Sequence, residues 1–364
     1  MAFLAAGRSE AVRLAPVARR FPLVARVLCP GRLEQALVPG EVFVACGLRG
    51  PDALFKTDGR TSAARIAQAA RSLDALFARQ RPAVLVVHGS SDAALGAALA
   101  AQSRSIALVR VDAGVRTFEH PAREERNRVL TDRMADLLCA STASNAANLT
   151  AEGIAPRRIA LTGSTVLEAV GQHLPPARQR AHLLTRHGVS PDRFVLGAIE
   201  GTAASEDAAA LRAVLAELDR LAEGGWPVLL PAGRRLRATA ERAGCARLLS
   251  RLRIVERPDY GTFLALAREA ALVIADTGET EEDITVLGRP LVALGRRTGR
   301  PESLVDFTVL VAPGPDLGHH ARRLLAEAKA IRARLQQQPS PFGGLDAGRH
   351  IADATRRLLA DRAA

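Results

Sequence analysis

The chain has very little lysine and few aromatic side chains. Two of its 50 basic residues are lysines, Lys56 and Lys329, and the others are arginines. The arginines alternate with acids along predicted helices, so the formal net charge of +12 forms no stripe that would follow a phosphate backbone. Aromatic residues make up 3% of the chain, which leaves few rings for stacking on single-stranded bases. This composition argues against a nucleic acid partner.

The chain also lacks clustered cysteines and long apolar runs. Its four cysteines, Cys29, Cys46, Cys139 and Cys245, are widely spaced and form no C-x-x-C pair, which indicates buried thiols in a reducing compartment. The eight histidines show no metal-ligand spacing, and His319 and His320 are predicted to lie in a loop. No segment is long enough to span a bilayer, and the first residues are too short for a signal peptide. The sequence predicts a cytoplasmic protein with no membrane partner, metal or other cofactor.

Short apolar segments typical of strands alternate with Ala/Leu/Arg-rich segments typical of helices. This alternation predicts parallel βαβ units, and hence an α/β fold. The chain of 364 residues is 48% hydrophobic, enough for two domains with separate cores. The predicted strands are 1–5, 24–28, 42–45, 83–87, 106–111, 137–140 and 159–163 in the first half, and 194–199, 226–231, 252–257, 272–276, 290–294 and 308–312 in the second.

The domain boundaries follow from the segments between these strands. Residues 167–191 form a charged helical segment that Leu174-Pro175-Pro176 interrupts, which is typical of a hinge. We therefore predict a Rossmann-like domain over 1–166, a nucleotide-binding Rossmann-like domain over 167–345, and a final helix over 346–364. In parallel sheets, ligands bind beyond the carboxyl ends of the strands, and Ser90, Asp112 and Glu124 all lie on or after such ends.

Four motifs in the first half, in order, resemble those of one enzyme family. VHGSSDAALGAALAA (87–101), RVDAGVRT (110–117), REERNRVLTDRMADLL (123–138) and LTGSTVLEAV (161–170) are similar to the usual forms VHGDTTTTLAAALAA, HVEAGLRT, PEEANRxLTDxLAD and xTGNTVIDAL of the UDP-N-acetylglucosamine 2-epimerases. Shorter similarities lie outside this stretch, at 6–16 (GTRPEAIKxAP in the family), 276–278 (DSGG), 300–302 (ERPE) and 340–343 (NPYG). Collinear motifs are more specific than any single one.

The resemblance implies a fold, a reaction and partners. It implies two Rossmann-like domains that face a cleft, the GT-B arrangement, with the C-terminal helix crossing back to the first domain. It implies an isomerase of polysaccharide biosynthesis, a homodimer, that inverts C2 of a UDP-sugar by eliminating UDP and adding it back, or that releases the free sugar where water enters. This chemistry requires a base and an acid near C2, and positively charged side chains that contact the diphosphate.

The resemblance also assigns site residues. Asp112 and Glu124 match catalytic carboxylates of the family, and Arg8 and Arg128 match arginines of the same cleft. Thr277, Gly278, Glu282 and Arg300 match its nucleotide site, in which a helix N-terminus receives the diphosphate. Three of the matched residues also have ordinary structural interpretations, because Glu124 and Arg128 are spaced as an i,i+4 helix pair and Asp112 precedes a turn.

Several positions depart from the family pattern. Ser90 replaces the aspartate of HGDT, and Asp92 is the nearest carboxylate that could substitute for it. The segments 199–204 and 231–235 lack the histidines of THRREN and PxHxNP, with Glu200 in one place and Arg234 and Arg235 near the other. Glu279 directly follows Gly278 in the segment expected to receive the diphosphate, and its negative charge there would repel that ligand. Two alternatives therefore remain open, namely a catalytically degenerate homologue that binds nucleotide sugars or regulates, and a GT-B glycosyltransferase.

Overall fold

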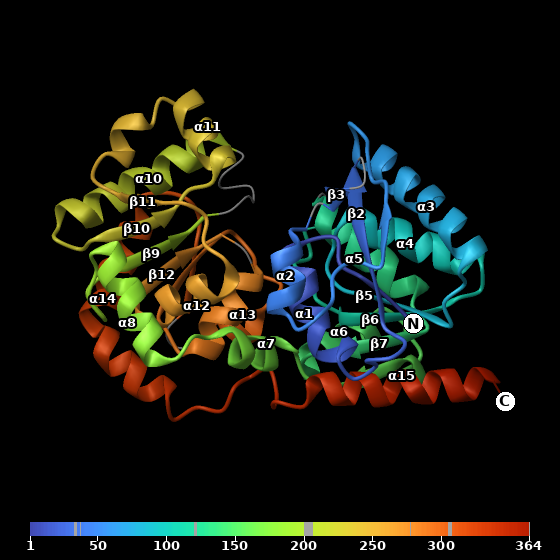
Figure 1. Cartoon of the computed structure of the whole chain (residues 1–364). Coiled ribbons are helices and arrows are strands. Elements are labelled where there is room, and N and C mark those ends of the chain that lie inside the picture. Colours follow the sequence, from blue (N-terminus) through green and yellow to red (C-terminus); the bar gives the residue numbers. More distant parts are fainter. Residues whose placement is uncertain are drawn as a thin grey trace. The chain divides into compact units, whose positions relative to one another are not determined.

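The computed structural model describes residues 1–32, 35–36, 38–119, 122–199, 207–276, 278–304 and 308–363. The chain forms two compact units, which we call unit 1 (Met1–Ala169 with Phe342–Ala364) and unit 2 (Val170–Pro341). The sequence predicts these boundaries at 166/167 and 345/346. Each unit is a parallel β-sheet with helices packed against it (Figure 1).

The sheet of unit 1 has the order β3-β2-β1-β5-β6-β7-β8, and β4 also pairs with β2. All of its pairings are parallel except that of β2 with β3. The chain order reverses between β1 and β5, which makes their carboxyl ends a switch point where α/β sheets bind ligands. The strands are β1 (Ala2–Leu4), β2 (Arg26–Arg32), β3 (Gln35–Ala36), β4 (Ala53–Phe55), β5 (Val84–Val87), β6 (Ala107–Ala113), β7 (Leu137–Ala140) and β8 (Ile159–Leu161).

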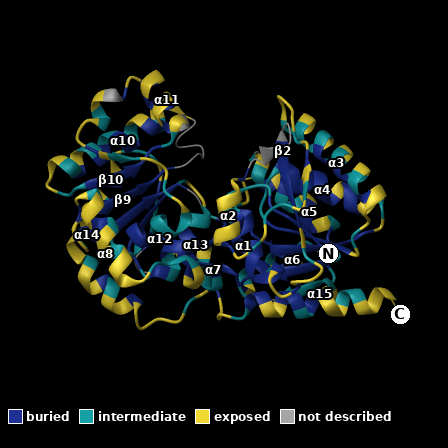
Figure 2. Cartoon of the chain, viewed as in Figure 1, coloured by how far each residue is buried: buried dark blue, intermediate teal, exposed yellow. Residues whose placement is uncertain are grey.

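Both faces of this sheet are covered, so its central strands are continuous apolar runs. On β5, Leu85 and Val87 join a core with α3 and α4, whereas Val84 and Val86 join a core with α1 and α15. Figure 2 shows these strands as buried between the helices. The helices are α1 (Arg8–Ala18), α2 (Gly40–Ala45), α3 (Ser62–Arg79), α4 (Asp92–Ser103), α5 (Arg123–Met134), α6 (Ala143–Ala151), α7 (Val166–His173, which reaches into unit 2) and α15 (Ala347–Ala363).

The C-terminal helix α15 packs on unit 1. Ile351 and Ala352 are buried in the core that contains α1, and the Arg362 guanidinium donates to Asp136 at 2.7 Å. The backbone N–H of Gly348 donates to Glu168 on α7 at 2.7 Å. Residues far apart in sequence thus complete one domain.

One predicted strand of unit 1 is wrong. Residues 42–45 (VFVA) lie in helix α2 and not in a strand. Only Phe43 of this run is buried, while Val44 is 71% exposed, so the run lacks the alternating burial of a strand. The place beside β2 is taken by β4, which the sequence does not predict.

The sheet of unit 2 is parallel throughout, with the order β11-β10-β9-β12-β13-β14. Its switch point lies between β9 and β12. The strands are β9 (Val195–Ala198), β10 (Val228–Pro231), β11 (Arg253–Val255), β12 (Leu272–Ala275), β13 (Leu291–Leu294) and β14 (Thr308–Val311). The helices are α8 (Ala177–His187), α10 (Ala208–Glu223), α11 (Arg234–Arg242), α12 (Tyr260–Glu269), α13 (Gly278–Leu287) and α14 (Asp316–Leu335).

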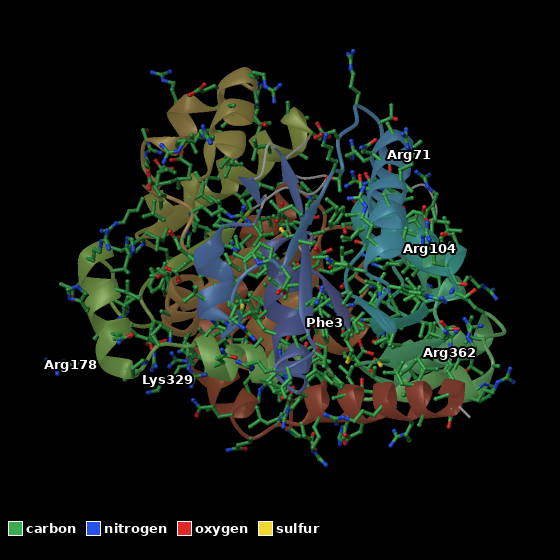
Figure 3. All side chains as sticks on the ribbon, turned by 45° about the vertical axis from the view of Figure 1, so that its right-hand side comes forward. Phe3, Arg71, Arg104, Arg178, Lys329 and Arg362 are labelled. Atoms are coloured by element: carbon green, nitrogen blue, oxygen red, sulfur yellow. The ribbon has the colours of Figure 1, made fainter. Side chains whose placement is uncertain are left out.

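Two surface features bear on the predicted partners. The predicted loop at His319 and His320 is wrong, because both residues lie in α14, which begins directly after Pro315. Figure 3 shows basic side chains projecting from many elements, among them Arg71, Arg178 and Arg362 on α3, α8 and α15. In the part of the chain that the structure describes, no helix has the length and apolarity to cross a bilayer, and no three His, Cys, Asp or Glu side chains are grouped to bind a metal.

Candidate functional site

The end of β6 is an irregular turn that fixes Asp112. The pairing of β6 with β7 shifts register between Val111 and Ala113, which is a bulge, and Asp112 has a φ of 54°. Gly114 follows with a φ of 81°, and a Cβ there would lie 2.2 Å from the carbonyl oxygen of Asn145 on α6. Only glycine fits this position. Bulges commonly re-aim a side chain beside a site, and this one directs the Asp112 carboxylate along the sheet edge.

The Asp112 carboxylate contacts side chains from both neighbouring strand ends. The Nε2 atom of His88, directly after β5, lies 2.8 Å from Asp112 Oδ2. The hydroxyl of Ser141, directly after β7, donates to Asp112 Oδ1. His88 and Asp112 are 2% and 5% exposed, so the pair is almost completely shielded from solvent. The sequence predicts Asp112 as a site residue but neither His88 nor Ser141.

Ser90 and Asp92 lie in the turn between β5 and α4. The Ser90 side chain is partly buried, and its carbonyl oxygen accepts a hydrogen bond from Asn127 Nδ2 at 3.0 Å. Asp92 begins α4 and accepts hydrogen bonds from Ser62 (2.7 Å), Arg65 (2.7 Å) and Asn127 (3.0 Å). It therefore joins α3, α4 and α5.

These contacts determine the charge of Asp92. Burial raises the pKa of its carboxyl, but the hydrogen bonds from Ser62, Asn127 and Arg65 and the charge of Arg123 outweigh burial and lower the pKa overall. Asp92 is thus a carboxylate at neutral pH whose oxygens accept hydrogen bonds from α3 and α5. This arrangement favours a structural role over replacement of the aspartate missing at position 90.

Glu124 and Arg128 both lie on α5 but have different partners. Glu124 pairs with Arg123, and Arg128 donates to Glu125 at 2.9 Å, so the i,i+4 pair that the spacing permits is not formed. Glu125 also accepts the backbone N–H groups of Thr117 at 3.1 Å and Phe118 at 3.0 Å, which holds the loop after β6.

The Glu124 side chain is 45% exposed and reachable from solvent. Burial raises its pKa, yet the hydrogen bond from Arg123, that from its own backbone, and the charges of Arg123 and Arg128 together lower the pKa below its usual value. Glu124 is consequently ionised at neutral pH. Arg128 thus acts on Glu124 through its charge without a direct pair.

Asp132 and Arg8 are two further motif residues of unit 1, and the first of them is structural. Asp132 is 1% exposed and pairs with Arg110 at 3.1 Å and with Arg116 at 2.8 Å. It also accepts the backbone N–H of Gly114 at 3.0 Å, so it anchors the turn that carries Asp112. Arg8, a predicted nucleotide-site residue, is partly buried at the start of α1, which follows β1 at the switch point.

In unit 2 the predicted nucleotide-site residues lie at the start of α13. Gly278 is its first residue, and a Cβ there would lie 3.9 Å from the Arg300 side chain. Glu282 is 1% exposed and forms an ion pair with Arg300, which is 8% exposed. Thr277 and Glu200 lie outside the described residues. Arg234 is exposed at the start of α11, and the side chain of Arg235 is also outside the described part.

The acids on either side of Glu282 are also engaged. Asp283 accepts the Tyr260 hydroxyl at 2.7 Å, and Glu281 accepts the hydroxyl of Thr298. Burial raises the pKa of Glu281 from 4.5 to about 7, although the Thr298 hydrogen bond and the Arg300 charge oppose the rise. Glu279, the residue expected to repel a diphosphate, is partly buried in the first turn.

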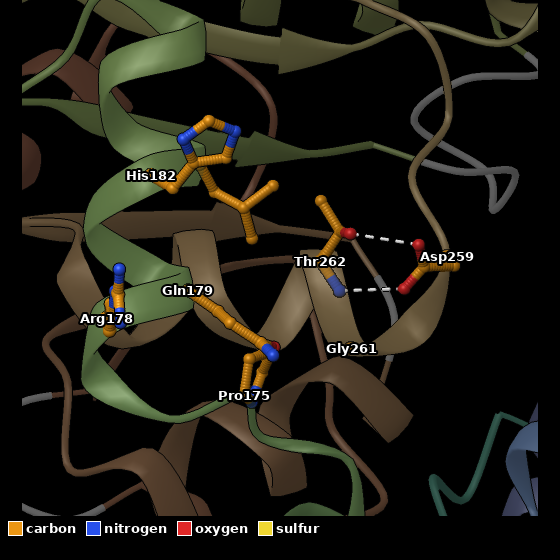
Figure 4. Close-up of a pocket in the computed structure, with 8 residues that line it drawn as sticks. Pro175, Arg178, Gln179, His182, Asp259, Gly261 and Thr262 are labelled. Atoms are coloured by element: carbon orange, nitrogen blue, oxygen red, sulfur yellow. Dashed lines mark hydrogen bonds between the residues drawn. The ribbon is translucent and has the colours of Figure 1, made fainter.

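Unit 2 also has a surface hollow of about 690 Å³ (Figure 4). It lies between α8 and the start of α12, where Asp259 accepts hydrogen bonds from the N–H and hydroxyl of Thr262 at 2.8 and 2.9 Å. Its lining residues include none of the predicted site residues. The hollow therefore adds nothing to the site assignment.

Comparisons with known proteins agree with this arrangement. A sequence profile of the family described as UDP-N-acetylglucosamine 2-epimerase matches residues 38–356. The chain belongs to this family. It is 23% identical over 358 residues to the UDP-N-acetylglucosamine 2-epimerase of Methanococcus maripaludis, with 95% of each chain covered. It is 24% identical over 321 residues to the UDP-2,3-diacetamido-2,3-dideoxy-D-glucuronate 2-epimerase of Pseudomonas aeruginosa, covering 87% of this chain and 86% of the relative.

Solved structures agree on the fold. The Methanocaldococcus jannaschii UDP-GlcNAc 2-epimerase, in complex with UDP-GlcNAc and UDP, superposes with a TM-score of 0.83 at 22% identity, with 99% of each chain covered. The predicted UDP-N-acetylglucosamine 2-epimerase family, the GT-B-like fold of two parallel-sheet α/β units, and the class of isomerases acting on UDP-sugars are confirmed.

Proposed function

We propose that this chain inverts C2 of a UDP-sugar and that Asp112 and Glu124 exchange the C2 proton. A carboxylate removes that proton while the C1–O bond breaks and its electron pair leaves with UDP, which gives a glycal with a C1=C2 bond. Return of a proton to the opposite face of C2 and re-formation of the C1–O bond then complete the inversion. Acid–base groups of this kind contribute about 10²- to 10⁴-fold each.

A second group of predicted residues is proposed to bind UDP. The family motifs assign Arg8, Arg128 and Arg300 as sources of positive charge for the diphosphate. Gly278 leaves space at the N-terminus of α13, where backbone N–H groups favour an anion. Thr277 is proposed from the motif alone. Arg300 is paired with Glu282. If it binds the diphosphate, its guanidinium must either contact both groups or leave Glu282.

One observation carries the catalytic proposal. Two carboxylates that the family motifs assign to catalysis lie in the same β6–α5 segment, and each has partners that favour its charged form. Both carboxylates are present although Ser90 replaces a third acid of the family motif. The C2 chemistry therefore has both of its proposed acid–base groups within unit 1.

The proposal is tested by proton NMR of the purified protein with UDP-N-acetylglucosamine in D₂O. Loss of the C2 proton signal with formation of the 2-epimer is expected, and accompanying free sugar and UDP would indicate hydrolysis. The diacetamido-glucuronate UDP-sugar named for the Pseudomonas relative is the second substrate to test. No exchange with either sugar, at enzyme concentrations that turn a related epimerase over fully, would contradict the proposal.

One observation favours a second function, that of a UDP-sugar-binding homologue without turnover. Asp92, the carboxylate two residues after Ser90, accepts hydrogen bonds from α3 and α5 and cannot take the missing role without losing them. Both proposals predict binding in a calorimetric titration with UDP-N-acetylglucosamine, and the NMR experiment separates them, because a binding homologue leaves the sugar unchanged in D₂O.

We further propose a cytoplasmic homodimer, as the family resemblance implies. Sedimentation equilibrium tests the oligomer, with twice the chain mass of 38.6 kDa expected and the single mass contradicting it.

A further inference from the structure

The histidine beside Asp112 has one ring nitrogen without a partner. His88 lies at the carboxyl end of β5 and is 2% exposed. Its Nε2 atom lies 2.8 Å from Asp112, whereas its Nδ1 atom is buried without a hydrogen-bond partner among the described residues. An N–H buried without an acceptor costs free energy, and a charged imidazolium would carry such an N–H at Nδ1. The proton of a neutral ring is therefore placed on Nε2, facing Asp112.

This tautomer gives the Asp112 carboxylate two neutral donors. His88 donates to Oδ2, and the Ser141 hydroxyl donates to Oδ1. Hydrogen bonds to the charged form stabilise that form, and two bonds from opposite neighbours also fix the orientation of the carboxylate plane.

Such support matters because of the length of the side chain. The family motif HVEAGLRT carries a glutamate where this chain carries Asp112, whose side chain is one methylene shorter. The bulge at Val111–Ala113 and the φ of 54° set the start of this shorter side chain, and His88 and Ser141 set its end. A catalytic group displaced by about 1 Å can cost about 10²-fold in rate.

We propose that His88, as an Nε2–H tautomer, and Ser141 are positioning residues that hold Asp112 as an oriented carboxylate for the C2 proton transfer. The inference rests on the proposed function of Asp112. His88 itself is shielded and acts through Asp112. Its role is confined to supplying one donor, so a side chain that places an amide N–H at the Nε2 position replaces it.

The tautomer is measured first, because it does not require turnover. Nitrogen-15 NMR of the histidine side chains, with the His88 signals assigned by their loss in His88→Gln, is expected to show a neutral ring protonated at Nε2 and bare at Nδ1. A proton on Nδ1, or on both nitrogens at neutral pH, would overturn the proposal. This readout stands even if the wild-type protein turns over no UDP-sugar, in which case the proposed function fails alone.

Kinetics of the full chain give the second test. His88→Leu removes the donor and is expected to lower kcat about 10- to 100-fold with little change in KM, since a hydrogen bond to a charged group is lost. His88→Gln keeps a donor at the same reach and should recover most of kcat. Ser141→Ala should lower kcat about 10-fold by the same argument.

A matched control is Thr355→Val, which removes another fully buried hydroxyl of unit 1, one that donates to Ile351 in α15. Its kcat should equal that of wild type. Equal losses in His88→Gln and His88→Leu, or unchanged kcat in both His88→Leu and Ser141→Ala, would overturn the positioning role. If His88→Leu fails to fold, the order of kcat among the other proteins still tests the role. The expected order is wild type first, then His88→Gln, then Ser141→Ala.

Discussion

The two units hold their buried acids in different ways. In unit 1, Asp132 receives two guanidinium groups and a backbone N–H, and Asp92 receives three side-chain donors from α3 and α5. In unit 2, Glu281 receives one hydroxyl from Thr298, and burial raises its pKa to about 7. The lowered pKa of Asp92 keeps its charge unchanged across the neutral range, while the charge of Glu281 in the α13 motif of unit 2 changes with pH.

This difference separates two parts of the proposed function. The C2 chemistry is assigned to unit 1, where a set of buried donors holds Asp112 from both sides. The nucleotide site is assigned to unit 2, where an acid close to the anion site retains a proton near neutral pH. We expect substitutions in the first set to cost stability or rate, and a substitution at Glu281 to have effects that depend on pH.

The largest expected effect follows from removing the charge of Asp132. Asp132→Asn leaves Arg110 and Arg116 buried without their shared partner, which should cost about 3–5 kcal/mol of unfolding free energy. Urea unfolding followed by far-UV circular dichroism reports on both units, whereas fluorescence of Trp226, the one tryptophan, reports on unit 2. The dichroism transition should move more.

The comparison for Asp132 is Asp74→Asn, which breaks the more exposed pair with Arg104 and should change stability little. Equal losses of unfolding free energy in the two variants would contradict the stabilising role given to the buried ion pairs of Asp132.

Glu281→Gln should stabilise unit 2 at high pH only. The pKa of Glu281 is raised from 4.5 to about 7 in the folded protein. The stability that its protonated form contributes is therefore complete below pH 4.5, and it is lost between pH 4.5 and 7, where Glu281 is ionised in the unfolded chain but still protonated in the folded one. The variant should exceed wild type by up to about 3 kcal/mol at pH 8 and match it at pH 4. Trp226 fluorescence in urea measures both values. A difference independent of pH would refute the raised pKa, and Glu327→Gln on exposed α14 is the control.

Glu124→Gln should lower kcat by about 10²-fold while the fold stays intact, because it removes an ionised group proposed to exchange the C2 proton. Its side chain is 45% exposed, so little packing is lost. Steady-state epimerisation is the measurement, with Glu119→Gln on the exposed preceding loop as the control. A kcat within twofold of wild type would remove Glu124 from the mechanism.

The smallest expected effect is a gain. Ser90→Asp restores the carboxylate of the family motif in a turn that Asn127 already holds, and we expect kcat to rise by about 10-fold. A decrease would show that the serine suits the chemistry of this chain better than the family's aspartate.

Much of the fold could be predicted from the sequence, because buried parallel strands are continuous apolar runs between helical segments. The error at 42–45 shows where this reasoning stops. VFVA has strand-forming residues, but tertiary contacts bury only Phe43, and the strand place goes to 53–55. Likewise, proline residues before His319 suggested a loop, although a proline is also common just before a helix.

Prediction of the candidate site was less complete. The rule that polar residues after strands form the site points to His88 and Ser141 as clearly as to Asp112, so these two could have been found. The engagement of Asp92 with Ser62 and Arg65 could not, since it depends on how α3 packs on α4. Arg116 and Asp132 belong to the family motifs, but only the structure shows that their side chains form a buried ion pair.

The most direct test of the account is the rate of C2 hydrogen–deuterium exchange in UDP-N-acetylglucosamine, measured by NMR in D₂O for wild type and Asp112→Asn. Asparagine keeps the size of the side chain but cannot take up the proton. We predict exchange by wild type and a loss of at least about 10²-fold in the variant, with UDP still bound. Exchange at equal rates in the two proteins would contradict the assignment of the chemistry to the carboxylates of unit 1.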